Sequence, residues 1–276
     1  MAGLSYTPFA ERVVSNAQIV GTGAPGTSVA EGTVPNFGSI VQLISAASND
    51  IEAWEIWVFV NINQNPSATA SGACVDILAG GAGVEEVLIP GLLVGGAYGT
   101  ASRAFTFPLL IPPGTRISAR AATETSHASN PSVLVELRGG GIAPHPTGSK
   151  VITYGTKVND ARGQAITPTA SGGARSVTEL TAATSRDHFY LLPSFQVEVD
   201  TTISTQTFNN IGIGVGSGSG DQLGPWWFGK DAAERQSGPF PQKGAYRRVP
   251  SGTRLTMLAS NGGANDTNHG GLIHAV

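Results

Sequence analysis

The feature that most constrains this chain is an internal repeat, because its second half restates three blocks of the first half in the same order. The matching positions are Leu43 and Leu180, Asp76 and Gly212, and Ile111 and Val249, at offsets of 136 to 138 residues. Offsets that differ by single residues are expected when loops drift while strands keep the register of a buried face. The repeat predicts two copies of one domain in tandem.

Each copy has the pattern of short strands separated by turns. Residues 54–60 and 188–197 are rich in aromatic and β-branched side chains, and both lie just after the first repeated block. The second block has the pattern of strand, glycine turn and strand, and no window longer than about ten residues has helical apolar spacing. We therefore expect an all-β chain of two tandem duplicated β-sandwich domains, with a jelly roll as one subtype.

A stretch rich in glycine and proline, residues 139–148, separates the two copies. Such a stretch neither extends a sheet nor starts a helix easily. We expect an extended N-terminal arm over 1–35, a first sandwich over 36–140, a linker over 141–164 and a second sandwich over 165–276. Residues 149–164 are compatible with pairing to either sandwich.

Composition excludes several partners. The formal net charge of −3 and the absence of a basic cluster argue against nucleic acid, which is bound by neutralising phosphates. The first residues lack the pattern of a secretory signal, and no apolar run is long enough for a membrane span. We expect a soluble protein made in a cytoplasm, and a charged fraction of 13% suits packing against neighbours in an assembly.

No constellation of residues predicts catalysis, a metal or a cofactor. Cys74 lies alone in an apolar run, and the five histidines are scattered. The glycine-rich segments 80–83 and 212–220 fit neither phosphate-binding motif and are interpreted as turns. The sequence therefore predicts a protein that is not an enzyme, with no metal and no cofactor.

Arg116 and Arg254 recur at equivalent places, each in a Gly-Thr-Arg element before a strand. Asp50 and Asp187 recur as well. We interpret the arginines as structural forks of donors that tie a neighbouring loop to the sheet through these aspartates, with ligand contact as the alternative.

Trp226 and Trp227 replace an aliphatic segment of the first copy. Because neighbouring residues of a strand face opposite ways, one ring is expected inside and the other on the surface, although burial of both is the alternative. An exposed ring, with the polar loop that contains Asn265 and Asp266, is a candidate contact for a glycan or a neighbouring subunit.

The first copy contains a glycine turn and an Ile-Pro strand across 76–90 and an Ile-Pro-Pro-Gly-Thr-Arg element at 111–116. In these motifs it resembles a group of small β-domain virion proteins of tailed bacteriophages and gene-transfer particles. The resemblance implies a structural role in a particle, on the head surface or in attachment fibres, with contact to host glycans. The second copy departs from this pattern at Gly212 and at Trp226-Trp227.

Two hypotheses follow. In the first, the protein is a non-enzymatic virion component, either a capsid decoration or head spike or a fibre-associated protein. It forms a homo-oligomer and contacts other capsid or tail proteins. In the second, it is a carbohydrate-binding attachment module for host surface polysaccharide. The sequence leaves head and tail locations open.

Overall fold

A computed structural model describes residues 12–16, 26–33, 36–63, 72–95, 100–123, 130–155, 163–169, 174–197, 207–217, 221–230, 236–237, 243–261 and 269–276. Within these ranges the regular structure consists of strands and one 3-10 turn, η1 (Ala46–Ser48). The expectation of an all-β, sandwich-like chain is confirmed.

The first sandwich has two sheets. One sheet contains β1 (Arg12–Ser15), β2 (Thr27–Ser28), β10 (Ser132–Gly139), β5 (Ala53–Asn63) and β8 (Thr100–Phe107). The other contains β3 (Glu31–Thr33), β4 (Val41–Ile44), β9 (Arg116–Thr123), β6 (Gly72–Gly80) and β7 (Glu86–Gly95). The strands β1 and β2 both pair with β10, and β3 and β4 both pair with β9.

The second sandwich has the same plan. One sheet contains β11 (Ile152–Tyr154), β12 (Gln164–Ile166), β20 (His269–Ala275), β14 (His188–Val197) and β18 (Ala245–Val249). The other contains β13 (Ser176–Thr181), β19 (Leu255–Asn261), β15 (Thr207–Val215), β16 (Asp221–Lys230) and β17 (Gln236–Ser237). Here β11 and β12 share the edge of β20, as β1 and β2 share that of β10.

The order of pairing is the same in both halves. The path β10-β5-β8 corresponds to β20-β14-β18, and β4-β9-β6-β7 corresponds to β13-β19-β15-β16. Two facing sheets in which the first strand pairs with the last are the arrangement of a jelly roll. Descent of the two halves from one duplicated domain stays a prediction.

The described parts of the expected arm and linker include short strands. The described residues of 1–35 form β1, β2 and β3, which add to the sheets of the first sandwich. Residues 152–154, inside the expected linker, and residues 164–166, at its boundary with the second sandwich, pair with β20 of the second sandwich. These short strands pair with the edges of β9, β10 and β20, whose backbone groups need partners.

Alternation along the strands builds the cores. In β5, Ile56 and Val58 are fully buried between the sheets, whereas Trp57 faces outward and is half-buried. The side-chain period of two produces this pattern. The core of the first sandwich also includes side chains of the second half, among them Tyr190, Leu192 and Val276.

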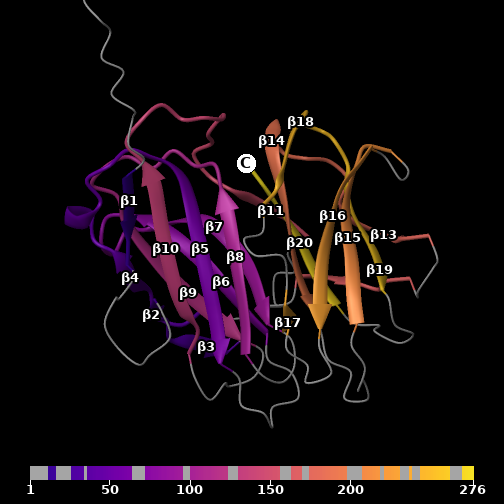
Figure 1. The fold of residues 1–276 in the computed structure, drawn as a ribbon, viewed down its shortest axis with the longest axis horizontal. Coiled ribbons are helices and arrows are strands. Elements are labelled where there is room, and N and C mark those ends of the chain that lie inside the picture. The colour runs from indigo at the N-terminus through magenta and orange to yellow at the C-terminus, as the bar shows by residue number, and fades with distance from the viewer. Residues whose placement is uncertain are drawn as a thin grey trace, which may run out of the picture.

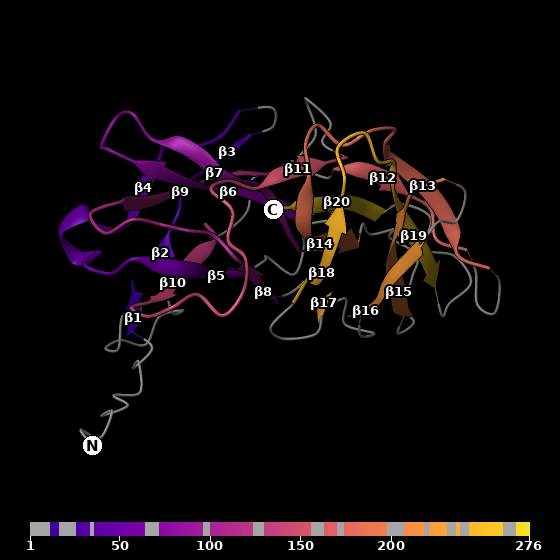
Figure 2. The same ribbon diagram turned by 90° about the horizontal axis from the view of Figure 1, so that it is seen from above.

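The sandwiches lie side by side, and the chain ends between them (Figures 1 and 2). The outer face of β14 and β20 packs against β7 and β8 of the first sandwich, a contact that we call the seam. Within it, the Leu93 amide donates to Ser194 Oγ at 3.0 Å, and Leu272 belongs to one apolar cluster with Leu93 and Cys74. The two sandwiches are therefore joined by an apolar contact with its own hydrogen bonds.

Candidate functional site

Tyr190 ties the seam from the second sandwich. Its hydroxyl donates to the Thr106 carbonyl at 2.7 Å and accepts from the Gly244 amide at 2.7 Å. Burial raises the pKa of Tyr190, so the phenol keeps its proton and remains a donor. The hydroxyl satisfies backbone groups of both sandwiches.

His274 is fully buried in the seam. The Thr153 hydroxyl donates to the Pro90 carbonyl at 2.8 Å and lies 2.9 Å from His274 Nδ1. Since the single hydroxyl proton goes to Pro90, we assign the proton of the imidazole to Nδ1. Burial lowers the pKa of His274 to about 3, and the ring is neutral.

Arg103 reaches from β8 to the second sandwich. Its guanidinium carbon lies 4.5 Å from the ring centre of Phe228 on β16. Burial lowers the pKa of Arg103 to about 9, so the group is still cationic at neutral pH. The cation over the aromatic face adds a second tie between the sandwiches.

The two tryptophans of β16 lie on opposite faces, as expected for one ring inside and one outside. Trp226 is 8% exposed, belongs to the second core and donates from Nε1 to the Lys243 carbonyl at 2.8 Å. Trp227 is 52% exposed on the outer face of its sheet. Trp227 is therefore the candidate contact residue, and Trp226 is a core residue. Asn265 and Asp266 lie outside the described residues.

The arginines do not pair with the predicted aspartates. Arg116 Nε lies 3.1 Å from Glu85 Oε1, and Arg254 pairs with Glu179. Arg116 has the β6–β7 turn as its neighbour, and Arg254 has the strand β13. Each guanidinium therefore pairs with a carboxylate of its own sheet. The expectation that Asp50 and Asp187 are their partners was wrong.

Each predicted aspartate has another partner. Asp50 Oδ2 accepts from Arg12 at 2.6 Å, and this hydrogen bond lowers the pKa of Asp50. Asp187 Oδ1 accepts from the Ser251 amide at 2.8 Å, in the turn of the second Gly-Thr-Arg element. Asp50 therefore binds β1 and Asp187 binds the turn at Ser251, each within its own sandwich.

Sequence reasoning missed the residues that anchor the repeated turn. The Asn49 side-chain amide donates to the Pro112 and Thr115 carbonyls at 3.1 and 3.0 Å. In the second sandwich, the Thr184 hydroxyl donates to the Pro250 carbonyl at 2.8 Å. A signal was present, because Asn49 and Thr184 belong to the same repeated block as the aspartates.

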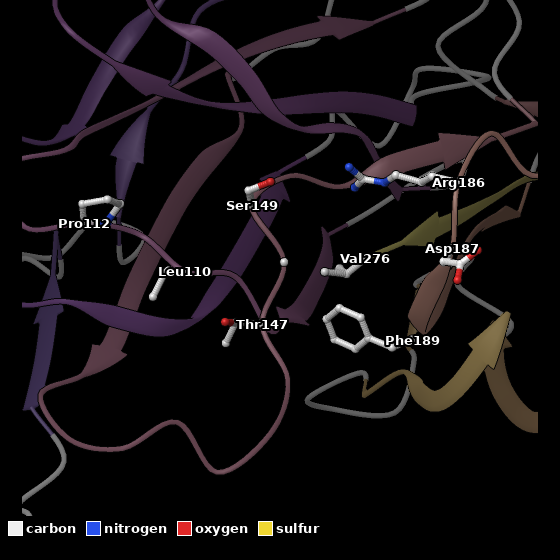
Figure 3. Close-up of a pocket in the computed structure, with 9 residues that line it drawn as sticks. Leu110, Pro112, Thr147, Ser149, Arg186, Asp187, Phe189 and Val276 are labelled. Carbon is white, nitrogen blue, oxygen red and sulfur yellow. The ribbon is translucent and has the colours of Figure 1, made fainter. Parts of the chain in front are cut away.

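A pocket of about 650 Å³ opens beside the seam (Figure 3). Its lining residues are Leu110, Pro112, Thr147, Gly148, Ser149, Arg186, Asp187, Phe189 and Val276. The connecting segment is fixed there by hydrogen bonds from the Leu110 amide to the Gly148 carbonyl and from the Gly148 amide to the Pro108 carbonyl. In Figure 3, Phe189 and Val276 point from the second sandwich toward Thr147.

The charged groups of this pocket are engaged by the protein itself. Arg186 Nη2 donates to the Lys150 carbonyl at 2.6 Å, and Asp187 accepts from Ser251. The hydroxyls of Thr147 and Ser149 and the ring of Phe189 line the rest of the pocket. An aromatic ring with hydroxyls can stack against and hydrogen-bond a sugar ring.

Among the described residues, no group of His, Cys, Asp and Glu is placed to hold a metal ion. Cys74 is buried. None of the described segments forms a helix with the length and apolar character to cross a membrane.

No protein family and no curated protein matches this sequence. Two solved structures with some similarity are PNGF-II and the cryo-EM structure of Broad Bean Stain Virus. The PNGF-II match has a TM-score of 0.38 and 11% identity, and covers 96% of this chain and 65% of that one. The virus match has a TM-score of 0.30 and 9% identity, and covers 97% of this chain and 88% of that one. Similarities this low identify no family.

Proposed function

We propose that the protein is a non-enzymatic structural component of a tailed-phage or phage-like virion, as a capsid decoration, head spike or fibre-associated protein. It works by packing against other copies and other virion proteins. The observation that carries the proposal is Trp227, which is 52% exposed on an ordered strand. Tryptophan is enriched at protein interfaces relative to the rest of the surface.

Two further features support this proposal. The first copy resembles small virion proteins in its turn and strand motifs at 76–90 and 111–116. In addition, the seam joins the sandwiches by buried apolar groups such as Leu93 and Leu272, which suits a unit that is built into a larger lattice.

Light scattering of the purified protein at several concentrations tests the proposal. A structural component that packs with copies of itself gives a discrete oligomer whose mass persists on dilution. A mass equal to one chain of 28.2 kDa at every concentration would contradict self-packing.

The second candidate function is binding of host surface polysaccharide. It is favoured by the exposed ring of Trp227 and by the pocket with Phe189, Thr147 and Ser149. A glycan array probed with the wild type and with Trp227→Ala and Phe189→Ala tests it. Loss of binding in either variant supports this function. Val84→Ala, at an exposed turn residue, is the control, and loss of binding in this variant as well would show that the losses are nonspecific.

A further inference from the structure

The common pairing order gives residues of the strands that the two sandwiches share a counterpart in the other sandwich. On the sheet of β6 and β7, Cys74 pairs with Leu93 and with Ala122. Asn210 corresponds to Cys74, because each lies two residues before the matched positions Asp76 and Gly212. Asn210 pairs with Trp227 and Ser260. Trp227 is therefore the counterpart of Leu93.

The residues on the opposite side of the seam also have counterparts in the other sandwich. Leu134 on β10 pairs with Phe59 on β5, and Leu272 on β20 pairs with Ser194 on β14. The buried pair Ile56 and Leu137 in the first sandwich corresponds to the buried pair Leu191 and Ala275 in the second. Three residues along each strand from these pairs lie Leu134 and Leu272, which are therefore counterparts.

The seam brings Leu93 and Leu272 together, whereas their counterparts, Trp227 and Leu134, do not meet within one chain. Leu93 and Leu272 are 0% and 1% exposed and belong to one apolar cluster. A Cβ placed on Gly91, beside Leu93, would lie 3.2 Å from Leu272 Cδ1. Their counterparts stay at the surface, because Trp227 is 52% exposed and Leu134 is partly exposed.

We propose that a second copy of this chain repeats the seam between molecules, with Trp227 of one copy packed against Leu134 and the outer face of β5 and β10 of the next. This inference rests on the proposed structural function and names the surfaces that carry it. A second copy is the expected occupant, because the seam already packs the face around Leu272, which corresponds to that around Leu134, against Leu93, which corresponds to Trp227.

The chemistry of the receiving face fits an aromatic partner. Leu134 pairs across the strands with Phe59, and Trp57 lies two residues along β5 on the same face. The Arg138 guanidinium carbon lies 3.7 Å from the ring centre of Trp57, and the same guanidinium pairs with Glu136 at 3.0 Å. A tryptophan ring can pack on such a surface through apolar contact and through the guanidinium plane. Val177, 48% exposed, lies on β13 of the same sheet, and the Arg175 guanidinium lies over Gly212 between it and Trp227.

The proposed contact is heterologous, since one copy contributes the second sandwich and the next copy contributes the first. Such contacts build closed rings when the rotation between copies closes, and fibres when it does not. A contact of Trp227 with Trp227 of another copy would instead be isologous and would stop at a dimer.

A mixing experiment tests the direction of the contact. Trp227→Glu removes one surface and Leu134→Glu removes the other, so each variant alone is expected to be a monomer by light scattering. In an equimolar mixture, the intact face of each variant can meet its partner once, and a heterodimer of twice the chain mass is expected. Val84→Glu, at an apolar residue in the β6–β7 turn that is 75% exposed, should assemble like the wild type.

Three results would overturn the inference. They are full assembly of Trp227→Glu, full assembly of Leu134→Glu, and a mixture that stays monomeric while both variants keep the circular dichroism of the wild type. If the wild type assembles and the variants do too, the structural function survives and only this contact fails. A wild type that is monomeric at all concentrations contradicts both.

Discussion

The two sandwiches have one pairing order but bury different faces. At the centre of one part of the seam the contact residues are small or aliphatic, namely Gly91, Leu93, Ser194 and Leu272. The counterpart of Leu93 is exposed Trp227. The alternate side chains that point into each core thus set the strand order, which both sandwiches share. The side chains that point outward differ between the sandwiches and determine which faces are buried in the seam.

The largest expected effect separates the counterparts Leu272 and Leu134. Leu272→Ala removes a fully packed side chain from the seam and should lower the free energy of unfolding by about 2–4 kcal/mol. Leu134→Ala should cost less than about 1 kcal/mol in the monomer, because its side chain is partly exposed. Urea unfolding at low protein concentration measures both. Equal losses would mean that the seam is no more tightly packed than the outer face.

Acid should weaken the seam through His274. Its folded pKa of about 3 lies below the ordinary value of 6.5, so the unfolded chain takes up the proton first. Stability is then highest above pH 6.5 and falls as the pH is lowered toward 3. At pH 4.5 the expected loss is about 3 kcal/mol.

A pH series of urea midpoints checks the effect of His274, and His274→Asn supplies the control. The variant lowers overall stability, yet it should flatten the slope between pH 6.5 and 4.5. An unchanged slope in the variant would assign the acid sensitivity to other groups, such as His188, whose pKa is lowered to about 4 by burial and by Arg186.

Tyr190 and Tyr246 offer a smaller comparison. Tyr190→Phe leaves the Thr106 carbonyl and the Gly244 amide without their partner and should cost about 1–3 kcal/mol. Tyr246→Phe, at a residue that is 51% exposed, should change stability by less than about 0.5 kcal/mol. Thermal unfolding at neutral pH distinguishes the two, and a larger effect for Tyr246 would speak against the hydrogen-bonded seam.

The smallest effect concerns the repeated arginines. Arg254 pairs with Glu179 at the surface, where an ion pair contributes about 0–1 kcal/mol. A double-mutant cycle of Arg254→Ala and Glu179→Ala should give a coupling within that range that decreases in high salt. A cycle with Asp187 in place of Glu179 should give none.

The sequence predicted features that depend on neighbours along the chain. The alternation of apolar residues predicted the strands, and the positions of Trp226 and Trp227 on one strand predicted opposite faces. It did not predict the partner of Arg116, because Glu85 becomes its neighbour only when the β6–β7 turn lies beside β9. The seam was also out of reach, since the match of Leu93 to Leu272 depends on how two finished sandwiches pack.

The central claim is that Trp227 of one copy contacts Leu134 of the next, and cysteine crosslinking tests it most directly. Cys74 is buried, so the introduced thiols of a chain with both Trp227→Cys and Leu134→Cys would react selectively with a short bismaleimide. The account predicts a ladder of covalent oligomers from the double variant and none from either single variant. A covalent dimer from Trp227→Cys alone, or no ladder from an assembled double variant, would contradict it.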